Sequence, residues 1–501
     1  MENEIVMTRR DLVKTLGTAP AILRARSRSK PNLLLLMSDQ HRADWCGFAG
    51  NRFIHTPNLD RLAARGTVFD RAYSSTPSCT PARSALLTGK SPWGHGMLGY
   101  GRVAERYDVQ LPELVRAAGY STFGIGKMHW SPQRSLRGFE GTLLDESGRV
   151  ESAEFRSDYR AWFASEAPGL DPDATGIGWN DYRSGVYKLP ERLHPTRWTG
   201  DCAVRFIEEY QRPEPFFLKV SFARPHSPYD PPQRFWERYA AAEMPARKIG
   251  AWAEKYRPRS SDRADIWHGD VGEEEVRHSR IGYAGSISFM DEQAGRVIES
   301  LEKRHLLDET LILYLSDHGD MTGDHHMWRK SYPYEASAHI PMLLCGPGVR
   351  TTRSQTPVEV RDVLPTLVRA AGAAIPSGVD GQSLFQAGRE WIDLEHDVCY
   401  SPSNHWNALT DGKTKYIYHA ENGAEQLFDL ARDAQETNDL AGDASREADL
   451  RLWRARLIEH LAPRGAAWVR QGRLVPRPQG QLYSPNYPGG ALATKLGSSV
   501  F

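Results

Sequence analysis

The sequence lacks an excess of charge of either sign, because its 501 residues contain 63 Lys and Arg against 63 Asp and Glu. A general nucleic-acid binder needs a basic excess, and so does a protein held on anionic membranes by polybasic segments. Long apolar runs are also missing: the longest internal one, residues 33–37, is far shorter than the roughly 20 residues of a membrane span. We therefore expect no nucleic-acid partner and no membrane insertion.

Paired cysteines are missing as well. The five cysteines stand at positions 46, 79, 202, 345 and 399, and none belongs to a Cys-x-x-Cys pair. A zinc ribbon, a thioredoxin-type site and a disulfide framework therefore have no support. With 40% hydrophobic and 25% charged residues, the composition is that of an ordinary globular chain, which excludes disorder throughout.

The amino terminus has the features of an export signal. Thr8-Arg9-Arg10 resembles a twin-arginine motif, a weakly apolar stretch follows at residues 15–23, and basic residues follow at 24–28. We expect residues 1–30 to lie outside the fold and the protein to be periplasmic or secreted. The alternative is a cytoplasmic protein with a basic, disordered tail.

Short, continuous apolar runs alternate with helical patterns over most of the chain. The runs predict buried strands at residues 32–37, 121–125, 216–221, 311–316 and 341–345. The helical patterns lie at residues 58–65, 81–88, 111–118, 201–210, 273–303 and 360–371. This alternation predicts an α/β catalytic domain over residues 31–380, with a large, mainly parallel or mixed sheet sandwiched by helices. In such sheets the chemistry gathers at the carboxyl ends of the strands.

The carboxyl-terminal part has a different pattern. Two strand-like runs, residues 415–419 and 425–429, flank a loop with Asn422-Gly423, which is typical of an antiparallel hairpin. An amphipathic helix is predicted at residues 444–460. We therefore expect a smaller α+β subdomain, with its tail, over residues 381–501.

Cys79 lies where the chain is expected to enter a helix. In Cys79-Thr80-Pro81-Ala82-Arg83, Thr80 is a suitable N-cap and Pro81 suits the first helical position. The backbone N–H groups and the dipole of a helix amino terminus favour an anion. A nucleophile at this position would meet a substrate anion already held by positive charge, with Arg83 one turn further on.

Cys-x-Pro-x-Arg followed by Thr88-Gly89 resembles the signature of type I sulfatases, members of the alkaline phosphatase superfamily. The resemblance extends from residue 31 to about residue 440, with the motifs in the family's order. It implies that Cys79 is oxidised to formylglycine by a maturation enzyme, and that the hydrated aldehyde is the nucleophile. It also implies the alkaline phosphatase-like fold and the hydrolysis of a sulfate ester.

Two strands are expected to end in Ser-Asp, and each Asp is followed by another metal-ligand type: Asp39-Gln40 and Asp317-His318. Oxygen ligands suit a hard cation, and an imidazole widens the choice towards Mn²⁺ or Zn²⁺. The resemblance implies one divalent metal, Ca²⁺ with Mn²⁺ as the alternative, on these four residues and the side chain at position 79. The commonest family pattern is Asp-Asp with Asp-Asn, so this chain has one carboxylate fewer.

Lys127, His129 and His226 also follow predicted strands. Gly126-Lys127-Met128-His129 resembles the family's Gly-Lys-x-His, which implies Lys127 as a cation beside the nucleophile and His129 as a base. His226, between two prolines, matches a family histidine that contacts the scissile oxygen and donates a proton to the leaving group. Lys330 matches the lysine that holds the sulfate, and Arg83 is expected to offset its charge.

The substrate is predicted to be a sulfated saccharide, because six tryptophans fall in two weakly patterned stretches, residues 131–198 and 233–273, that should rim the site. They are Trp162, Trp179, Trp198, Trp236, Trp252 and Trp267. Their alternative role is packing those stretches onto the sheet. Two alternative functions are a phosphonate monoester or phosphodiester hydrolase of the same superfamily, and a non-catalytic saccharide-binding protein.

Overall fold

The computed structural model describes residues 30–146, 149–398, 400–401 and 404–489. The predicted export signal therefore lies outside the described residues. No helix in the described part of the chain is long and apolar enough to cross a membrane.

A mixed eight-stranded sheet forms the centre of the molecule, with strand order β5-β4-β6-β1-β7-β8-β2-β9. Neighbouring strands from β5 to β7 run parallel, whereas β8 is antiparallel to both β7 and β2. The strands are β1 (Asn32–Asp39), β2 (Gly66–Phe69), β4 (Ser121–Gly126), β5 (Gly141–Leu144), β6 (Phe216–Pro225), β7 (Thr310–Ser316), β8 (Met342–Cys345) and β9 (Thr352–Ser354). The predicted fold class is confirmed, although β2, β5 and β9 were not predicted.

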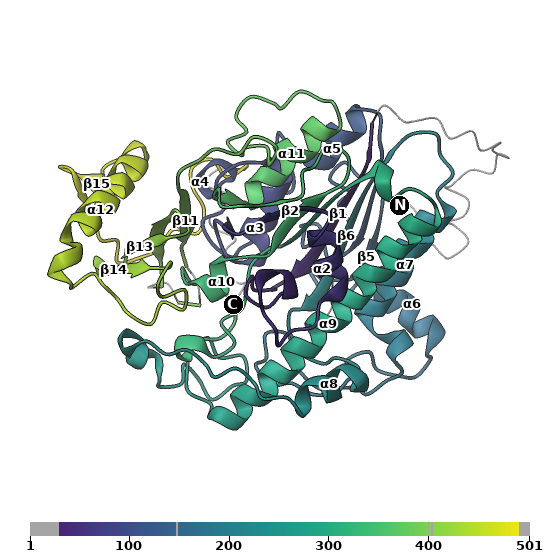
Figure 1. Ribbon diagram of the computed structural model, residues 1–501, viewed down its shortest axis with the longest axis horizontal. Helices are drawn as coiled ribbons and strands as arrows, with labels where there is room; N and C mark the ends of the chain where they lie inside the picture. The colour runs from purple at the N-terminus through teal and green to yellow at the C-terminus, as the bar shows by residue number, and fades with distance from the viewer. Residues whose placement is uncertain (1–29, 147–148, 399, 402–403, 490–501) are drawn as a thin grey trace.

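Helices cover both faces of this sheet (Figure 1). Successive residues of β1 point to opposite faces, so Leu33 and Leu35 join one hydrophobic cluster while Leu34 and Leu36 join another. The first cluster includes side chains of α3 (Cys79–Thr88), α5 (Leu111–Ala117) and α11 (Val363–Ala370). The second includes side chains of α2 (Pro57–Ala63), α7 (Pro195–Glu209) and α9 (Glu273–Lys303). Burial on both faces explains why the central strands read as continuous apolar runs.

The carboxyl-terminal part forms a second, antiparallel sheet in the order β11-β12-β13-β14. Its strands are β11 (Ile392–His396), β12 (Trp406–Thr410), β13 (Thr414–His419) and β14 (Ala424–Asp429), and α12 (Glu447–Leu461) packs on one face. The other face packs against Tyr73 and Tyr334 of the preceding part of the chain. The smaller α+β subdomain is confirmed, and the predicted hairpin is its β13–β14 half; the division at residue 380 stays a prediction.

The remaining elements are short. They include β3 (Ala72–Tyr73), β10 (Val358–Glu359), β15 (Val469–Arg470), β16 (Arg473–Leu474), α4 (Pro92–His95), α6 (Asp158–Glu166), α8 (Gln233–Ala240) and α10 (Glu335–Ala338). The stretch at residues 131–198 is not only an excursion, because it contains β5, an edge strand of the large sheet.

The start of α3 differs from the prediction. The helix begins at Cys79 and its N-cap is Ser78, whose backbone is extended (φ −154°, ψ 157°). The Ala82 N–H donates to the Ser78 carbonyl at 3.1 Å and closes the first turn. Thr80 is therefore not the N-cap, and Pro81 stands at the third helical position instead of the first. The predicted location of Cys79 at the helix amino terminus is retained.

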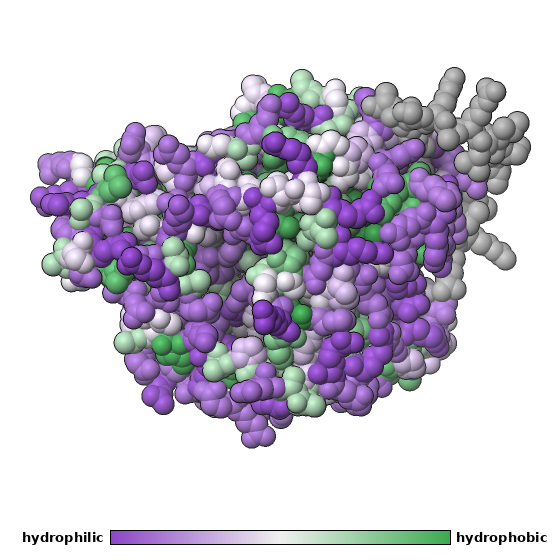
Figure 2. Space-filling view, in the orientation of Figure 1, coloured by the Kyte–Doolittle hydropathy of each residue, from purple (hydrophilic) through white to green (hydrophobic). Residues whose placement is uncertain are grey.

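Most of the face shown in Figure 2 is hydrophilic, with apolar side chains scattered over it. Large apolar residues that are exposed in the described part of the chain lie far apart in sequence: Leu136, Val150, Leu170, Ile375, Phe385 and Leu452. Scattered apolar side chains are ordinary on a protein surface.

Candidate active site

The predicted site residues meet at the carboxyl ends of the central strands of the large sheet. Asp39 ends β1, Asp317 follows β7, Lys127 follows β4, and His226 follows β6. Because β4, β6, β1 and β7 are consecutive parallel neighbours, their carboxyl ends lie together. Cys79 reaches the same place from the amino terminus of α3.

Asp39, Cys79, Asp317 and His318 form a buried group whose ligand atoms all lie within 4.8 Å of one another. Cys79 Sγ lies 3.1 Å from His318 Nε2. His318 Nδ1 lies 2.9 Å from the Gly319 carbonyl oxygen, which can only accept, so Nδ1 carries a proton. The lone pair of a neutral imidazole then lies on Nε2, facing the group, as in histidines that bind metals. Two carboxylates and this nitrogen fit a divalent cation.

Gln40 lies beside this group, but its side chain points elsewhere. Its Oε1 accepts a hydrogen bond from Lys330 Nζ at 2.8 Å, and its Nε2 donates to Asp320 Oδ2 at 2.5 Å. The Gln40 backbone N–H donates to Asp317 Oδ1 at 3.2 Å. Metal ligation by the Gln40 amide therefore stays a prediction.

Buried cations lie against both carboxylates. Arg83 Nη2 lies 3.0 Å from Asp39 Oδ2, and Arg83 Nε lies 2.8 Å from Asp317 Oδ2. Lys127 Nζ lies 2.5 Å from Asp39 Oδ2. Burial alone would raise the pKa of Asp39, but the charge of Lys127, with other cations, holds this pKa well below its ordinary value. Burial alone would lower the pKa of Lys127. The charges of Asp39 and Cys79 raise this pKa by more, so it lies above its ordinary value.

His226 and Lys330 form a second group. Lys330 Nζ lies 2.6 Å from His226 Nε2, and His226 Nδ1 lies 2.8 Å from the Ser227 carbonyl oxygen. An ammonium can only donate and a carbonyl can only accept, so His226 is neutral and protonated on Nδ1. Burial, followed by the charges of Lys330 and Lys127, holds the pKa of His226 well below its ordinary value. The proton that this pair can release is therefore on Lys330.

The contacts of His129 are with Glu146 and Tyr100. The backbone N–H groups of Met128 and His129 donate to Glu146 Oε1 at 3.0 and 2.9 Å, and His129 Nε2 lies 3.4 Å from the Tyr100 hydroxyl. Burial, then the charges of Arg149 and Lys127, holds the pKa of His129 well below its ordinary value. A neutral imidazole is the form that a base requires, and the role of His129 stays a prediction.

Sequence reasoning missed Asp320 and the position of Trp179. Asp320 accepts from Gln40 and from the Tyr229 hydroxyl, and its place three residues after Asp317 in a polar run was an available signal. The Trp179 ring stacks on the His226 imidazole with centroids 4.1 Å apart, and Lys127 Nζ lies 4.9 Å from its centroid.

Only one of the six tryptophans considered for sugar binding has these site contacts. The other five pack in hydrophobic clusters: Trp162, Trp198, Trp236, Trp252 and Trp267. Their contacts support the packing role that the sequence left open.

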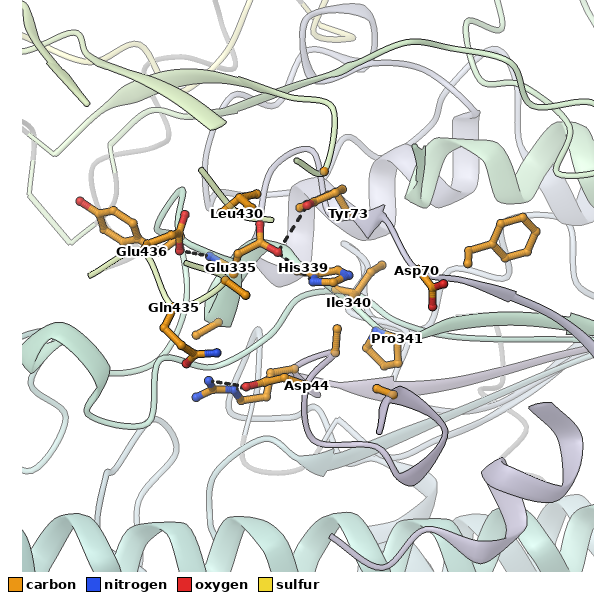
Figure 3. Close-up of a pocket in the computed structure, with 18 of the residues that line it drawn as sticks. Asp44, Asp70, Tyr73, Glu335, His339, Ile340, Pro341, Leu430, Gln435 and Glu436 are labelled. Atoms are coloured by element: carbon orange, nitrogen blue, oxygen red, sulfur yellow. Dashed lines mark hydrogen bonds and ion pairs between the residues drawn. The ribbon is translucent and has the colours of Figure 1, made fainter. Parts of the chain in front are cut away.

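A cavity of about 250 Å³ lies outside this site (Figure 3). It is lined by Asp44, Tyr73, Glu335 and His339, among others, and by none of the predicted catalytic residues or metal ligands. Figure 3 shows Glu335 directed towards Tyr73 and His339. We assign this cavity no part in the chemistry.

The sheet, its helical layers and the buried carboxylates at its strand ends define a hydrolase of the alkaline phosphatase-like class. Residues 31–373 match the Sulfatase family, and the chain belongs to that family. An arylsulfatase of Clostridium perfringens (strain 13 / Type A) is 35% identical over 472 residues, which cover 89% of this chain and 97% of that protein. The chain is a sulfuric ester hydrolase.

Solved structures that share its fold include the following two. Phosphonate monoester hydrolase of Agrobacterium radiobacter is 24% identical with a TM-score of 0.74, covering 89% of this chain and 100% of that chain. A protein solved in complex with its substrate D-glucosamine-2-N,6-O-disulfate is 20% identical with a TM-score of 0.70, covering 87% and 98%.

Proposed function

We propose that the protein hydrolyses sulfate esters with formylglycine at position 79 as the nucleophile and one divalent metal beside it. The observation that carries this proposal is the buried Cys79 at the start of α3, with metal-ligand atoms and the Lys127 ammonium, 3.8 Å from its Sγ, around it. The hydrated aldehyde supplies two hydroxyl groups, one to attack sulfur and one whose deprotonation expels sulfate.

Asp39, Gln40, Asp317 and His318 would hold the metal, which supplies Lewis-acid polarisation of the reacting oxygens when bound. Ca²⁺ is favoured over Mn²⁺ because oxygen donors predominate. Metal analysis of purified protein identifies the ion, and Asp317→Ala should abolish both its binding and turnover. Full activity of metal-free protein would contradict this part of the proposal.

The buried cations of the chain bind the sulfate group and stabilise the negative charge that develops on it. Arg83 and Lys127 are paired with Asp39 and Asp317, whereas the buried Lys330 ammonium contacts the neutral side chains of Gln40, Asn180 and His226 and so offers its charge to an anion. Lys330, paired with His226, donates the proton that the leaving alcohol takes up. His129 accepts the proton from the second hydroxyl of residue 79.

The natural substrate is proposed to be a sulfated saccharide. Trp179 beside His226 supports this class, because an indole ring packs on the apolar face of a sugar and His226 is paired with Lys330, the proposed proton donor to the leaving group. The fold neighbour that takes a glucosamine disulfate is further support. The test compares sulfated mono- and oligosaccharides with 4-nitrophenyl sulfate.

Trp179→Ala should lower kcat/KM for the saccharides more than for the aryl sulfate. Trp236→Ala is the matched control, because Trp236 packs in a hydrophobic cluster and should change only stability. If the aryl sulfate has the highest kcat/KM of all substrates, the saccharide proposal fails.

Phosphonate monoester hydrolysis is the second candidate, favoured by the structural similarity to such a hydrolase. The kcat/KM values for an aryl sulfate and an aryl phosphonate ester with the same leaving group separate the two functions. A larger value for the phosphonate would replace sulfate ester hydrolysis as the main activity.

We also propose that the protein is exported in folded form, because its twin arginine precedes an apolar stretch. Fractionation of cells that produce Arg9→Lys with Arg10→Lys should find the protein only in the cytoplasm. Normal export of this double variant would reject the proposal.

A further inference from the structure

Ser78, the N-cap of the nucleophile helix, does not use its side chain as a cap. Serine is among the best N-cap residues, because its hydroxyl usually accepts from the second or third N–H of the helix. Here the third residue is Pro81, which has no N–H. The Ser78 Oγ instead lies 3.0 Å from Nε2 of His396, at the end of β11 in the carboxyl-terminal sheet. Both side chains are fully buried.

The same strand is bonded to the backbone that precedes Cys79. The Glu395 N–H donates to the Ser75 carbonyl at 2.8 Å, next to the His396–Ser78 contact. β11 therefore holds the segment from Ser75 to Ser78 through one backbone and one side-chain hydrogen bond. Residue 79 is the next residue along the chain.

The cross-strand partner of His396 reaches the second catalytic segment. His396 pairs with Trp406 in the β11–β12 register, and Trp406 Nε1 donates to the Ser331 carbonyl at 3.1 Å. The Ser331 N–H in turn donates to the Pro77 carbonyl at 2.8 Å. One cross-strand pair thus connects to the residues next to both position 79 and Lys330.

The backbone around Lys330 needs such support. Arg329 and Ser331, on either side of it, have φ values of 66° and 77°. Residues other than glycine adopt this region only where surrounding contacts fix it, and at a cost of about 1–3 kcal/mol each. The Trp406 and Pro77 hydrogen bonds supply contacts of that kind.

We propose that His396 and Trp406 are positioning residues for sulfate ester hydrolysis, which hold residue 79 and Lys330 in their reacting positions from the carboxyl-terminal sheet. This inference rests on the proposed roles of residue 79 and Lys330. On this proposal the carboxyl-terminal sheet takes part in catalysis, although it contributes no group that touches the substrate.

The experiment measures kcat and KM for 4-nitrophenyl sulfate well below the unfolding temperature, with kcat expressed per formylglycine determined by mass spectrometry. His396→Ala should lower kcat about 10- to 100-fold, with KM within about three-fold, because small displacements of reacting groups cost rate more than binding. His396→Gln, which keeps a nitrogen near the Nε2 position, should recover most of the loss. Trp406→Phe, which keeps a ring but lacks the N–H, should lower kcat about 10-fold.

The kcat values of single and double variants of Ser78 and His396 distinguish a positioning role from general destabilisation. Ser78→Ala should reproduce the kcat loss, and the His396→Ala/Ser78→Ala double variant should be no slower than the slower single variant. The matched control is His419→Ala, which removes a half-buried imidazole from the same sheet, where it contacts Gln426 instead of the site. It should lower Tm without changing kcat.

The inference is overturned if Ser78→Ala or a folded His396 variant keeps kcat within about two-fold, or if the two losses multiply. Ser78→Ala and Trp406→Phe decide the matter if His396→Ala does not fold. Failure of the proposed function looks different: wild-type protein with formylglycine would then turn over no sulfate ester.

Discussion

At the scale of single residues, the buried Lys330 ammonium contacts neutral partners, namely Gln40, Asn180 and His226. Arg83 and Lys127 are instead paired with Asp39 and Asp317. A buried cation whose contacts are neutral is costly, so it is retained where an anion or a transition state offsets its charge. The arrangement suits a substrate whose negative charge is concentrated on one group, as in a sulfate ester.

We propose that Lys330, and not His226, holds the transferable proton. Lys330→Ala should therefore lower kcat/KM about 10²- to 10⁴-fold for an alkyl sulfate, the range for losing a general acid. The loss should be smaller for 4-nitrophenyl sulfate, because nitrophenolate leaves without protonation. Steady-state kinetics with both substrates checks this, with the exposed Lys188→Ala as control. Equal losses for the two substrates would show that Lys330 only binds sulfate.

At the scale of elements, the loop after β7 is fixed to its surroundings by one buried carboxylate. Asp324 accepts from Arg280 of α9 at 2.7 Å and from Arg42, just beyond β1, at 2.9 Å. Burial raises the pKa of Asp324, but Arg280 and Arg42 lower it more, from 3.8 to about 2. A depressed carboxyl pKa stabilises the fold above about pH 4, and this contribution is lost as the pH falls towards 2.

Asp324→Asn should therefore lower the free energy of unfolding by about 3–5 kcal/mol at pH 7, since the buried Arg280 guanidinium loses its charged partner and Arg42 keeps only Asp44. Urea unfolding at pH 7 and at pH 3 measures this, and the difference from wild type should shrink at pH 3. Asp308→Asn, which breaks an exposed pair with Arg65, is the control and should cost less than about 1 kcal/mol. A difference that does not change with pH would contradict the assignment.

The helices and strands show which parts of the structure the sequence could predict. Residues 33–37 and 311–315 are apolar throughout because both faces of their strands are covered, so the strands and the polar residues after them could be predicted. Short edge strands such as β5 lack that signal. The contact of Trp179 with His226 and that of His396 with Ser78 join distant segments, so only the fold reveals them.

At the scale of the whole molecule, the two sheets are joined by a buried ionic cluster. Lys415 of β13 is fully buried and lies 2.7 Å from Glu335 of α10 and 2.8 Å from Glu436. A lysine so placed is stable as a cation only while both carboxylates stay close. The cluster therefore ties the docking of the carboxyl-terminal sheet to the catalytic part.

Lys415→Ala should lower the free energy of unfolding by about 3–5 kcal/mol, because it leaves the Glu436 carboxylate buried without its cation and leaves Glu335 with His339 alone. Chemical denaturation checks this against Lys413→Ala, two residues away on the exposed surface, which should change stability by less than about 0.5 kcal/mol. A loss below about 1 kcal/mol for Lys415→Ala would mean that the cluster contributes little to docking.

The central claim is that residue 79 acts as formylglycine, and the mass of the tryptic peptide of residues 72–83 tests it most directly. The peptide ends at Arg83 and contains no other cleavage site. In active protein from a host with the maturation enzyme, we predict the aldehyde at position 79, in a proportion that tracks kcat across preparations. Fully active protein whose peptide carries only an intact, alkylatable Cys79 thiol would contradict the account.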